Sequence, residues 1–244
     1  MDKKTLKALQ RHDLVEISDA GRRRVFAEIA ARSGSDQLDK VRHLIVGDET
    51  SAKIPGIVRR EDNDPRPGMI PVGFVSPFRL EGNRMRIAAF VAQADINALI
   101  SPTAVLRRPF VARTPCLKAL ADIAVMAGRL GLEMGVWGSA ALEVYTGLPF
   151  TDAGSDLDLL IEGTEVEVMR DFQSKAMKIA EQWKCKTDVE VALPSGYGVK
   201  LAELFLSTET ILAKGLHDVT LLPKQAVYSM LNNKGQKKYK DMEE

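Results

Sequence analysis

Two aspartates alternate with leucines at Asp156-Leu157-Asp158-Leu159, and this short pattern constrains the fold more than any other stretch of the chain. Alternate residues of a β-strand share one face, so Asp156 and Asp158 point to one side and the two leucines point to the other side, into a core. Neighbouring carboxylates repel each other, and burial increases the cost. Such a strand is tolerable at a solvated sheet edge, the more frequent case for the pattern alone, or beside a cation.

The residues before this strand favour a cation. Gly138 and Ser139 stand between a short apolar strand and a predicted helix, for which Ser139 would be an ordinary N-cap. Glycine lets a phosphate approach the backbone, and a helix N-terminus offers free N–H groups. Mg²⁺ prefers oxygen ligands and usually binds one or two carboxylates together with substrate phosphates. The pattern therefore predicts that Gly138 and Ser139 hold phosphates while Asp156 and Asp158 hold Mg²⁺.

A third acidic side chain is available in the segment TDVEVALP, at 187–194. Asp188 and Glu190 share one face of this predicted strand, and the intervening valines share the other. If the strand pairs beside the one that carries Asp158, either acid could complete the site. We favour Asp188 as the metal ligand because a shorter side chain holds a metal more tightly, but the pattern equally fits an exposed strand.

The order of predicted elements indicates an α+β chain with two domains. A small β-rich domain is expected over 1–108, and a domain with a mixed sheet and flanking helices over 109–244, with the boundary in the proline-containing segment 107–115. In the first domain we expect strands at 56–59, 69–75 and 84–91, followed by a short helix or turn within 93–106. In the second we expect helices at 116–131, 139–147 and 166–183 and strands at 133–138, 156–162 and 187–194.

Composition excludes several classes of protein. The formal net charge is +1, so bulk electrostatics give no support for binding nucleic acid or a membrane surface. Cys116 and Cys185 belong to no Cys-x-x-Cys motif, which argues against structural zinc and a disulfide framework and suits a reducing compartment. Residues 1–15 are charged and unlike a signal peptide, and no apolar run reaches the roughly 18 residues of a membrane span. We therefore expect a cytoplasmic protein.

The strand, Gly-Ser, helix, Asp-x-Asp order resembles the nucleotidyltransferase superfamily typified by DNA polymerase beta, although the loop between Ser139 and Asp156 is longer than in its simplest members. Within that superfamily, most of the chain resembles the malonate decarboxylase holo-acyl-carrier-protein synthases, also called phosphoribosyl-dephospho-CoA transferases. The resemblance is carried by RHDLV at 11–15, GIVRR at 56–60, IPVGFVS at 70–76, GSAALEVYTGLPFTDAGSDLDLLIE at 138–162 and PSGYGVKLAEL at 194–204.

The resemblance implies a polymerase-beta-like catalytic domain and a specific reaction. The 2′-(5″-phosphoribosyl)-3′-dephospho-CoA group would pass from its triphosphate precursor to a serine of the apo acyl-carrier subunit, and pyrophosphate would leave. Asp156 and Asp158 would ligate Mg²⁺, and Asp188 or Glu190 would bind a second metal or take the proton from the serine. Two alternatives remain: a nucleotidyltransferase that adenylylates a small molecule or a protein, and a non-catalytic module that binds the carrier protein.

Some polar residues outside the central motif are further candidates. Arg59 and Arg60 end a predicted strand and suit phosphate recognition, although an arginine pair is more often a solvated strand end and adjacent strand residues face opposite sides. Lys200 and Lys214 are weaker candidates of the same kind. His12 belongs to the family-like RHDLV segment, yet a hydrogen-bonded structural role is favoured. Trp137 could stack on a base, although burial in a central strand is the favoured role.

Overall fold

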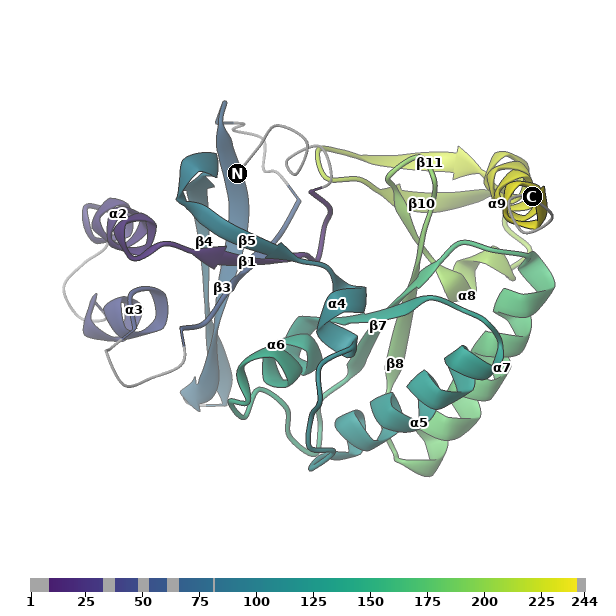
Figure 1. The fold of residues 1–244 in the computed structure, drawn as a ribbon, viewed down its shortest axis with the longest axis horizontal. Helices are drawn as coiled ribbons and strands as arrows, with labels where there is room; N and C mark the ends of the chain where they lie inside the picture. Colours follow the sequence, from purple (N-terminus) through teal and green to yellow (C-terminus); the bar gives the residue numbers. More distant parts are fainter. Residues whose placement is uncertain (1–8, 33–37, 48–52, 61–65, 81, 241–244) are drawn as a thin grey trace.

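The computed structural model describes residues 9–32, 38–47, 53–60, 66–80 and 82–240. These residues form two β-sheets, one from each half of the chain, and helices cover the outer side of each sheet (Figure 1). Part of the expectation for residues 1–15, that for residues 1–8, lies outside the described residues. Among the described residues, no helix combines the length and the apolar character needed to cross a bilayer.

The N-terminal sheet has five antiparallel strands in the order β4-β3-β2-β1-β5. Helices α2 and α3 pack on one face of it, at the left of Figure 1, and the Ser18 hydroxyl caps α2 by accepting a hydrogen bond from the amide of Gly21. The elements are β1 (Leu14–Ile17), α2 (Asp19–Ala30), α3 (Leu38–Ile45), β2 (Gly56–Val58), β3 (Met69–Leu80), β4 (Asn83–Ala92) and β5 (Ile96–Ile100).

The three strands predicted for this half are confirmed, but β3 extends five residues beyond its predicted end, to Leu80. The expected helix or turn within 93–106 was only partly right. It contains a 3₁₀ turn (Gln93–Asp95), the strand β5 and the short helix α4 (Pro102–Leu106). Helix α4 packs against β6 (Met134–Trp137) of the second sheet, so the chain passes between the halves soon after β5.

The C-terminal sheet is mixed, with the strand order β11-β10-β9-β8-β7-β6. Strands β7 and β8 run parallel because the long helix α7 connects them, and the other neighbours are antiparallel. Helices α5 and α7 pack together on one face (Figure 1). The remaining elements are α5 (Pro115–Arg129), α6 (Gly138–Thr146), β7 (Leu157–Glu162), α7 (Val166–Gln182), β8 (Thr187–Ala192), β9 (Gly198–Lys200), α8 (Leu201–Leu204), β10 (Thr210–Lys214), β11 (Val219–Pro223) and α9 (Lys224–Lys240).

Local signals set the ends of the helices that support the central strands. Thr114 caps α5 by accepting from the amide of Leu117, and Pro115 occupies its first turn, where the missing N–H costs nothing. Gly147 ends α6 in the left-handed conformation, with φ 73°. The predicted N-cap of α6 was wrong by two positions: the helix begins at Gly138, and Trp137 rather than Ser139 is its N-cap.

Candidate active site

A cavity of about 780 Å³ lies between the two sheets. Both halves of the chain line it, and it contains most of the residues expected to be functional. Its wall includes six arginines and one lysine, the Gly138-Ser139 pair and two carboxylates, so a chain of almost neutral overall charge has a strongly cationic cavity. The cationic residues are Arg11, Arg59, Arg60, Arg79, Arg84, Arg86 and Lys214.

The two carboxylates of the cavity are Asp156 and Asp158, at the N-terminal end of β7. Leu157 and Leu159 are fully buried on the opposite face, as the alternation predicts. The pKa of Asp158 is raised to about 6, first by burial and then by the negative charges of Asp188 and Asp156, while Arg86 opposes the rise. The repulsion inferred from the sequence is therefore present, and the positive charges of the cavity do not cancel it.

Gly138 touches this carboxylate directly. Strand register pairs Trp137 with Asp158, which places Gly138 at the start of α6 beside the aspartate. Its φ is +70°, and a Cβ added there would lie 2.4 Å from Oδ2 of Asp158. Only glycine satisfies both conditions without moving the carboxylate. Ser139 follows in the first turn of α6 and also lines the cavity, so the amides of this helix start and the carboxylates share one space.

Asp188 is the neighbour of Asp158 on the next strand. The parallel register of β7 and β8 pairs the two aspartates, which meets the condition that the sequence analysis left open. Lys200 Nζ lies 3.0 Å from Asp188 Oδ1, but the alignment is poor, and this buried oxygen accepts no hydrogen bond from the described residues. Lys200 and Asp188 border a different hollow beside α7, so the structure brings neither of these two predicted site residues to the wall of the main cavity.

Glu190 is held by the N-terminal half. Its Oε1 accepts from Arg11 Nη1 at 3.0 Å and lies 3.3 Å from His12 Nε2. Burial acts to raise the pKa of Glu190, but His12 and Arg11 outweigh it and keep the pKa below the ordinary value. Glu190 is thus engaged by Arg11 and His12, whereas Asp188 Oδ1 forms an ion pair with Lys200 but accepts no hydrogen bond from the described residues. The geometry therefore favours Asp188 over Glu190 beside Asp158.

His12 lies on the cavity wall, next to Trp137. The two rings stack with centroids 3.9 Å apart, and the indole N–H of Trp137 donates to the carbonyl of Leu159 at 3.2 Å. His12 has a φ of 74°, which is rare for a residue with a side chain. His12 therefore has the structural contacts favoured from the sequence, and it also lines the cavity that contains Asp158.

Arg59 and Arg60 both line the cavity, which differs from the expectation that only one would face it. Strand β2 ends at Val58, so the strict alternation of a strand no longer applies to the pair. Arg59 donates to the carbonyl of Val72 at 3.3 Å and lies over the ring of Phe90, while Arg60 is exposed.

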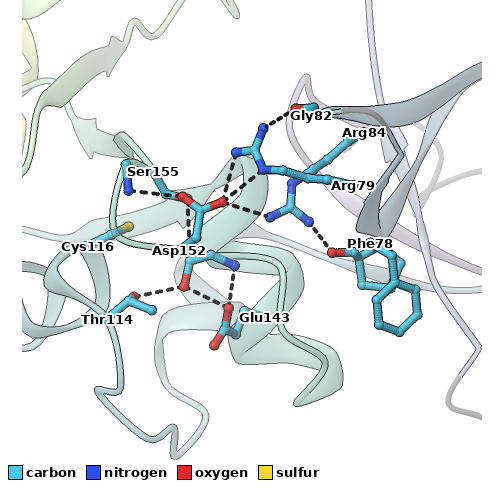
Figure 2. Close-up of polar contacts among 12 residues, drawn as sticks. Phe78, Arg79, Gly82, Arg84, Thr114, Cys116, Glu143, Asp152 and Ser155 are labelled. Atoms are coloured by element: carbon cyan, nitrogen blue, oxygen red, sulfur yellow. Dashed lines mark hydrogen bonds and ion pairs between the residues drawn. The ribbon is translucent and has the colours of Figure 1, made fainter.

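Sequence reasoning missed the arginines of the β3–β4 hairpin. Arg84 and Arg86 share a face of β4, and this spacing in NRMRIAAFV was the available signal. Arg79 comes from β3. Its guanidinium lies 3.0 Å (Nε) and 2.9 Å (Nη2) from Asp152 Oδ2, and Figure 2 shows Arg84 reaching the same carboxylate, at 3.6 Å. These contacts join the hairpin to the loop that leads into β7.

The loop between α6 and β7, which is longer than in the simplest members of the superfamily, is also held by hydrogen bonds among its own residues and to α6. Asp152 Oδ1 accepts from the amide of Gly154 and the hydroxyl of Ser155, and Ser155 accepts from the amide of Asp152 (Figure 2). Buried Glu143 accepts from the amide and hydroxyl of Thr151 at 2.6 and 2.7 Å. The chain therefore reaches Asp156 along a rigid path.

Two buried cysteines that look isolated in the sequence lie under this path. Cys116 Sγ is 3.4 Å from the carbonyl of Asp156, and Cys185 Sγ is 3.6 Å from that of Ser155. Both thiols are free and buried. Their role here is packing and weak hydrogen bonding beneath the carboxylates.

The carboxylates fit a metal that is shared with substrate. Among the described residues, no group of three or more His, Cys, Asp or Glu side chains could hold a metal ion by itself. Mg²⁺, however, usually takes only one or two protein carboxylates and completes its shell with phosphates and water. The pKa of Asp158 is raised, and Asp188 Oδ1, although it is paired with Lys200, accepts no hydrogen bond from the described residues. Both features suit carboxylates that share a cation.

Comparisons with known proteins cover most of the chain. Residues 10–102 match the phosphoribosyl-dephospho-CoA transferase MdcG N-terminal domain and residues 104–225 match the C-terminal domain. The chain is similar to a phosphoribosyl-dephospho-CoA transferase of Xanthomonas euvesicatoria, 31% identical over 73% of this chain and 83% of the relative. It is also similar to those of Pseudomonas putida and Pseudomonas aeruginosa, each 33% identical over 69% of this chain and over 78% and 77% of the relative. No solved structure matches. The chain belongs to the phosphoribosyl-dephospho-CoA transferase family, and it is a transferase.

Proposed function

We propose that this protein transfers the 2′-(5″-phosphoribosyl)-3′-dephospho-CoA group from its triphosphate precursor to a serine of the apo acyl-carrier subunit of malonate decarboxylase, with release of pyrophosphate. Family membership supports the transferred group. The observation that carries the proposal is the cavity, which combines Asp156, Asp158 and a helix start with a wall of seven cationic side chains. We also propose a cytoplasmic location, since free thiols suit a reducing compartment.

The cationic wall suits a triphosphate. A triphosphate chain carries several negative charges, and arginine matches phosphate oxygens with two parallel N–H donors. Arg60 and Arg86 are exposed on the wall, and Lys214 comes from β10 on the other side of the cavity. Charges from both sheets can therefore hold the phosphates between them, while the 780 Å³ volume leaves room for the ribose.

Asp156 and Asp158 would hold Mg²⁺, with Asp188 as the third carboxylate. When bound, Mg²⁺ neutralises charge that builds on the pyrophosphate leaving group. The amides of Gly138 and Ser139 would donate hydrogen bonds to phosphate oxygens at the start of α6, where the helix dipole favours negative charge. Ser139 adds a hydroxyl donor at the same place. The order β6, α6, β7 and the parallel partner β8 support a domain arranged like that of DNA polymerase beta.

The test is labelling of the apo carrier subunit. Purified protein, apo carrier, precursor and MgCl₂ are combined, and the mass of the carrier and the pyrophosphate released are measured. We expect the carrier to gain one phosphoribosyl-dephospho-CoA group per serine, and Asp156→Asn and Asp158→Asn to abolish the gain while the fold persists. Asp171→Asn is the matched control, because this exposed carboxylate on α7 pairs with Lys175 and lies outside the cavity. Full activity of both cavity variants contradicts the proposal.

The same site chemistry would serve another nucleotidyltransferase, so the assay includes a second donor. ATP replaces the precursor in a parallel reaction, with the carrier protein present. Pyrophosphate release from ATP together with adenylylation of the carrier, and no reaction with the precursor, would identify the protein as an adenylyltransferase instead.

A further inference from the structure

The reaction proposed above needs a group that takes the proton from the attacking serine. Asp156 and Asp158 are assigned to metal binding, and Glu190 is engaged by Arg11 and His12. Among the described residues lining the cavity, His12 is the only histidine. Its imidazole can accept a proton through a neutral nitrogen, and the ring also contacts the carboxylate of Glu190. The ring is only 8% exposed, so its position is set by packing rather than by solvent.

The backbone of His12 is unusual for a purely structural residue. Its φ of 74° lies in the left-handed region, which is unfavourable for a residue with a Cβ. The conformation turns the side chain away from β1 and toward the second sheet, where it stacks on Trp137 and meets Glu190 of β8. A strained backbone conformation of this kind is kept where the contacts of the side chain require it, here the contacts of the His12 ring with Trp137 and Glu190.

The contact with Glu190 sets which ring nitrogen is protonated. Nε2 lies 3.3 Å from Glu190 Oε1, and a carboxylate accepts hydrogen bonds, so Nε2 carries the proton. In the neutral ring Nδ1 is then the acceptor. The described residues offer no hydrogen bond to Nδ1, so this nitrogen remains available to a ligand.

We propose that His12 is the general base of the transfer and that Glu190 is its positioning residue. This inference rests on the proposed function. The serine Oγ forms a bond to the α-phosphorus of the precursor while its hydroxyl proton passes to Nδ1 of His12. The bond between the α-phosphorus and the oxygen that bridges to the β-phosphate breaks, and pyrophosphate leaves with the electron pair. Glu190 fixes the tautomer and stabilises the imidazolium that forms.

The surroundings keep the base ready at neutral pH. The charged groups that face His12 are Glu190 from β8, Lys214 from β10 and Arg11 from its own segment. Burial lowers the pKa of His12, the two cations lower it further, and Glu190 offsets part of the effect. The imidazole is therefore neutral above the ordinary histidine range, and the rate should fall only in acid, below about pH 6.5.

The first test compares His12→Asn and His12→Gly. Asparagine and glycine both tolerate the left-handed conformation, so the fold should persist, which thermal unfolding checks. We expect kcat for carrier labelling to fall by roughly 10²–10⁴-fold and the acid limb of the pH–rate profile to disappear. The control is Asp13→Asn. This neighbouring buried carboxyl has a pKa raised to about 7 by burial, but it contacts the amide of Gln10, so its loss should leave the acid limb in place.

The second test uses Glu190→Gln. Because Glu190 raises the pKa of His12, we expect the acid limb to move to lower pH, with a smaller loss of kcat than in the His12 variants. In the wild type, NMR titration of His12, one of only three histidines, should give the same pKa as the acid limb. Wild-type rates and an unchanged acid limb in both His12 variants would overturn the role of His12 while leaving the proposed function intact. Failure of the wild type to label the carrier would contradict the proposed function, and the role of His12 with it.

Discussion

Asp152 and Asp158 border the same region of the molecule but have opposite electrostatic environments. In the loop before β7, Asp152 receives Arg79, the amide of Gly154 and the hydroxyl of Ser155, and its pKa is lowered, chiefly by Arg79 (Figure 2). In β7, Asp158 is more buried and faces Asp188 and Asp156, so its pKa rises to about 6. One carboxylate is satisfied by the fold, and the other is not.

The difference separates a carboxylate that the fold satisfies from one that remains a candidate for binding a ligand. The charge of Asp152 is balanced once the chain has folded, so it stabilises the loop and needs nothing further. The charge of Asp158 is not balanced by the protein alone, and this is the state expected of a residue that awaits a cation or substrate. Of the two, only Asp158 lines the cavity.

The largest expected effect comes from Asp158→Asn. Activity should fall on the order of a thousandfold, equivalent to about 4 kcal/mol. The reason is that the carboxylate would help to hold the metal ion, and the metal ion would balance the charge of the leaving group. The same variant should raise the free energy of unfolding at pH 7.5 by about 2 kcal/mol, since it removes a repelled and partly buried charge. Carrier labelling and urea unfolding measure the two effects.

The gain in stability has a defined pH window. The folded pKa of Asp158 lies above the ordinary value of 3.8, so ionisation opposes folding, and its full cost is present above about pH 6. Below about pH 4 the group is protonated in both states and the cost vanishes. The stabilisation by Asp158→Asn should therefore be absent in acid and grow between these values. If Asp158→Asn had a lower free energy of unfolding than the wild type at pH 7.5, the negative charge of Asp158 would be stabilised by the protein itself.

Local patterns were sufficient to predict the strand of Asp158 and its immediate supports. The buried leucines, the helix after Pro115 and the end of α6 at Gly147 follow from alternation, helical spacing and capping residues. The pairing with the Asp188 strand was only a condition of the sequence argument, and the structure supplies it. These features depend on residues that are close in sequence, so a single chain displays them.

The cationic wall and the surroundings of Asp152 depend on contacts between distant residues. Arg11 meets Glu190 across 179 positions, and Arg79 meets Asp152 across 73. Strands β1 and β5 were missed for a related reason. They are short, and their place in the sheet is set by pairing with each other and not by their own composition. A local pattern carries no information about which distant element will lie opposite.

A smaller effect is expected from a matched pair of glycine variants. Gly138 and Gly147, at the two ends of α6, have φ of 70° and 73°, so alanine at either position should cost a similar 1–2 kcal/mol of stability. Only at Gly138 would the new Cβ displace Asp158 Oδ2, whereas at Gly147 there is open space. We expect Gly138→Ala to lose roughly a hundredfold in kcat and Gly147→Ala to keep it. Equal losses in both would mean that helix stability, and not the place of the carboxylate, sets the rate.

The smallest effect is expected from Asp152→Asn, and its sign is opposite to that of Asp158→Asn. The variant loses the ion pair with Arg79 and weakens two hydrogen bonds in the loop. Because the side chain is 40% exposed, we expect a loss of only about 1 kcal/mol in the free energy of unfolding at pH 7.5. The folded pKa is lowered, so this contribution is lost as the pH falls through about 4 and below, and the variant and wild type should converge in acid.

Arg84 still donates to the carbonyls of Ser76 and Pro77, so the hairpin keeps its shape and kcat should change only a few-fold. A loss of activity as large as that of Asp158→Asn would place Asp152 among the groups that act on substrate and would remove the distinction between the two carboxylates.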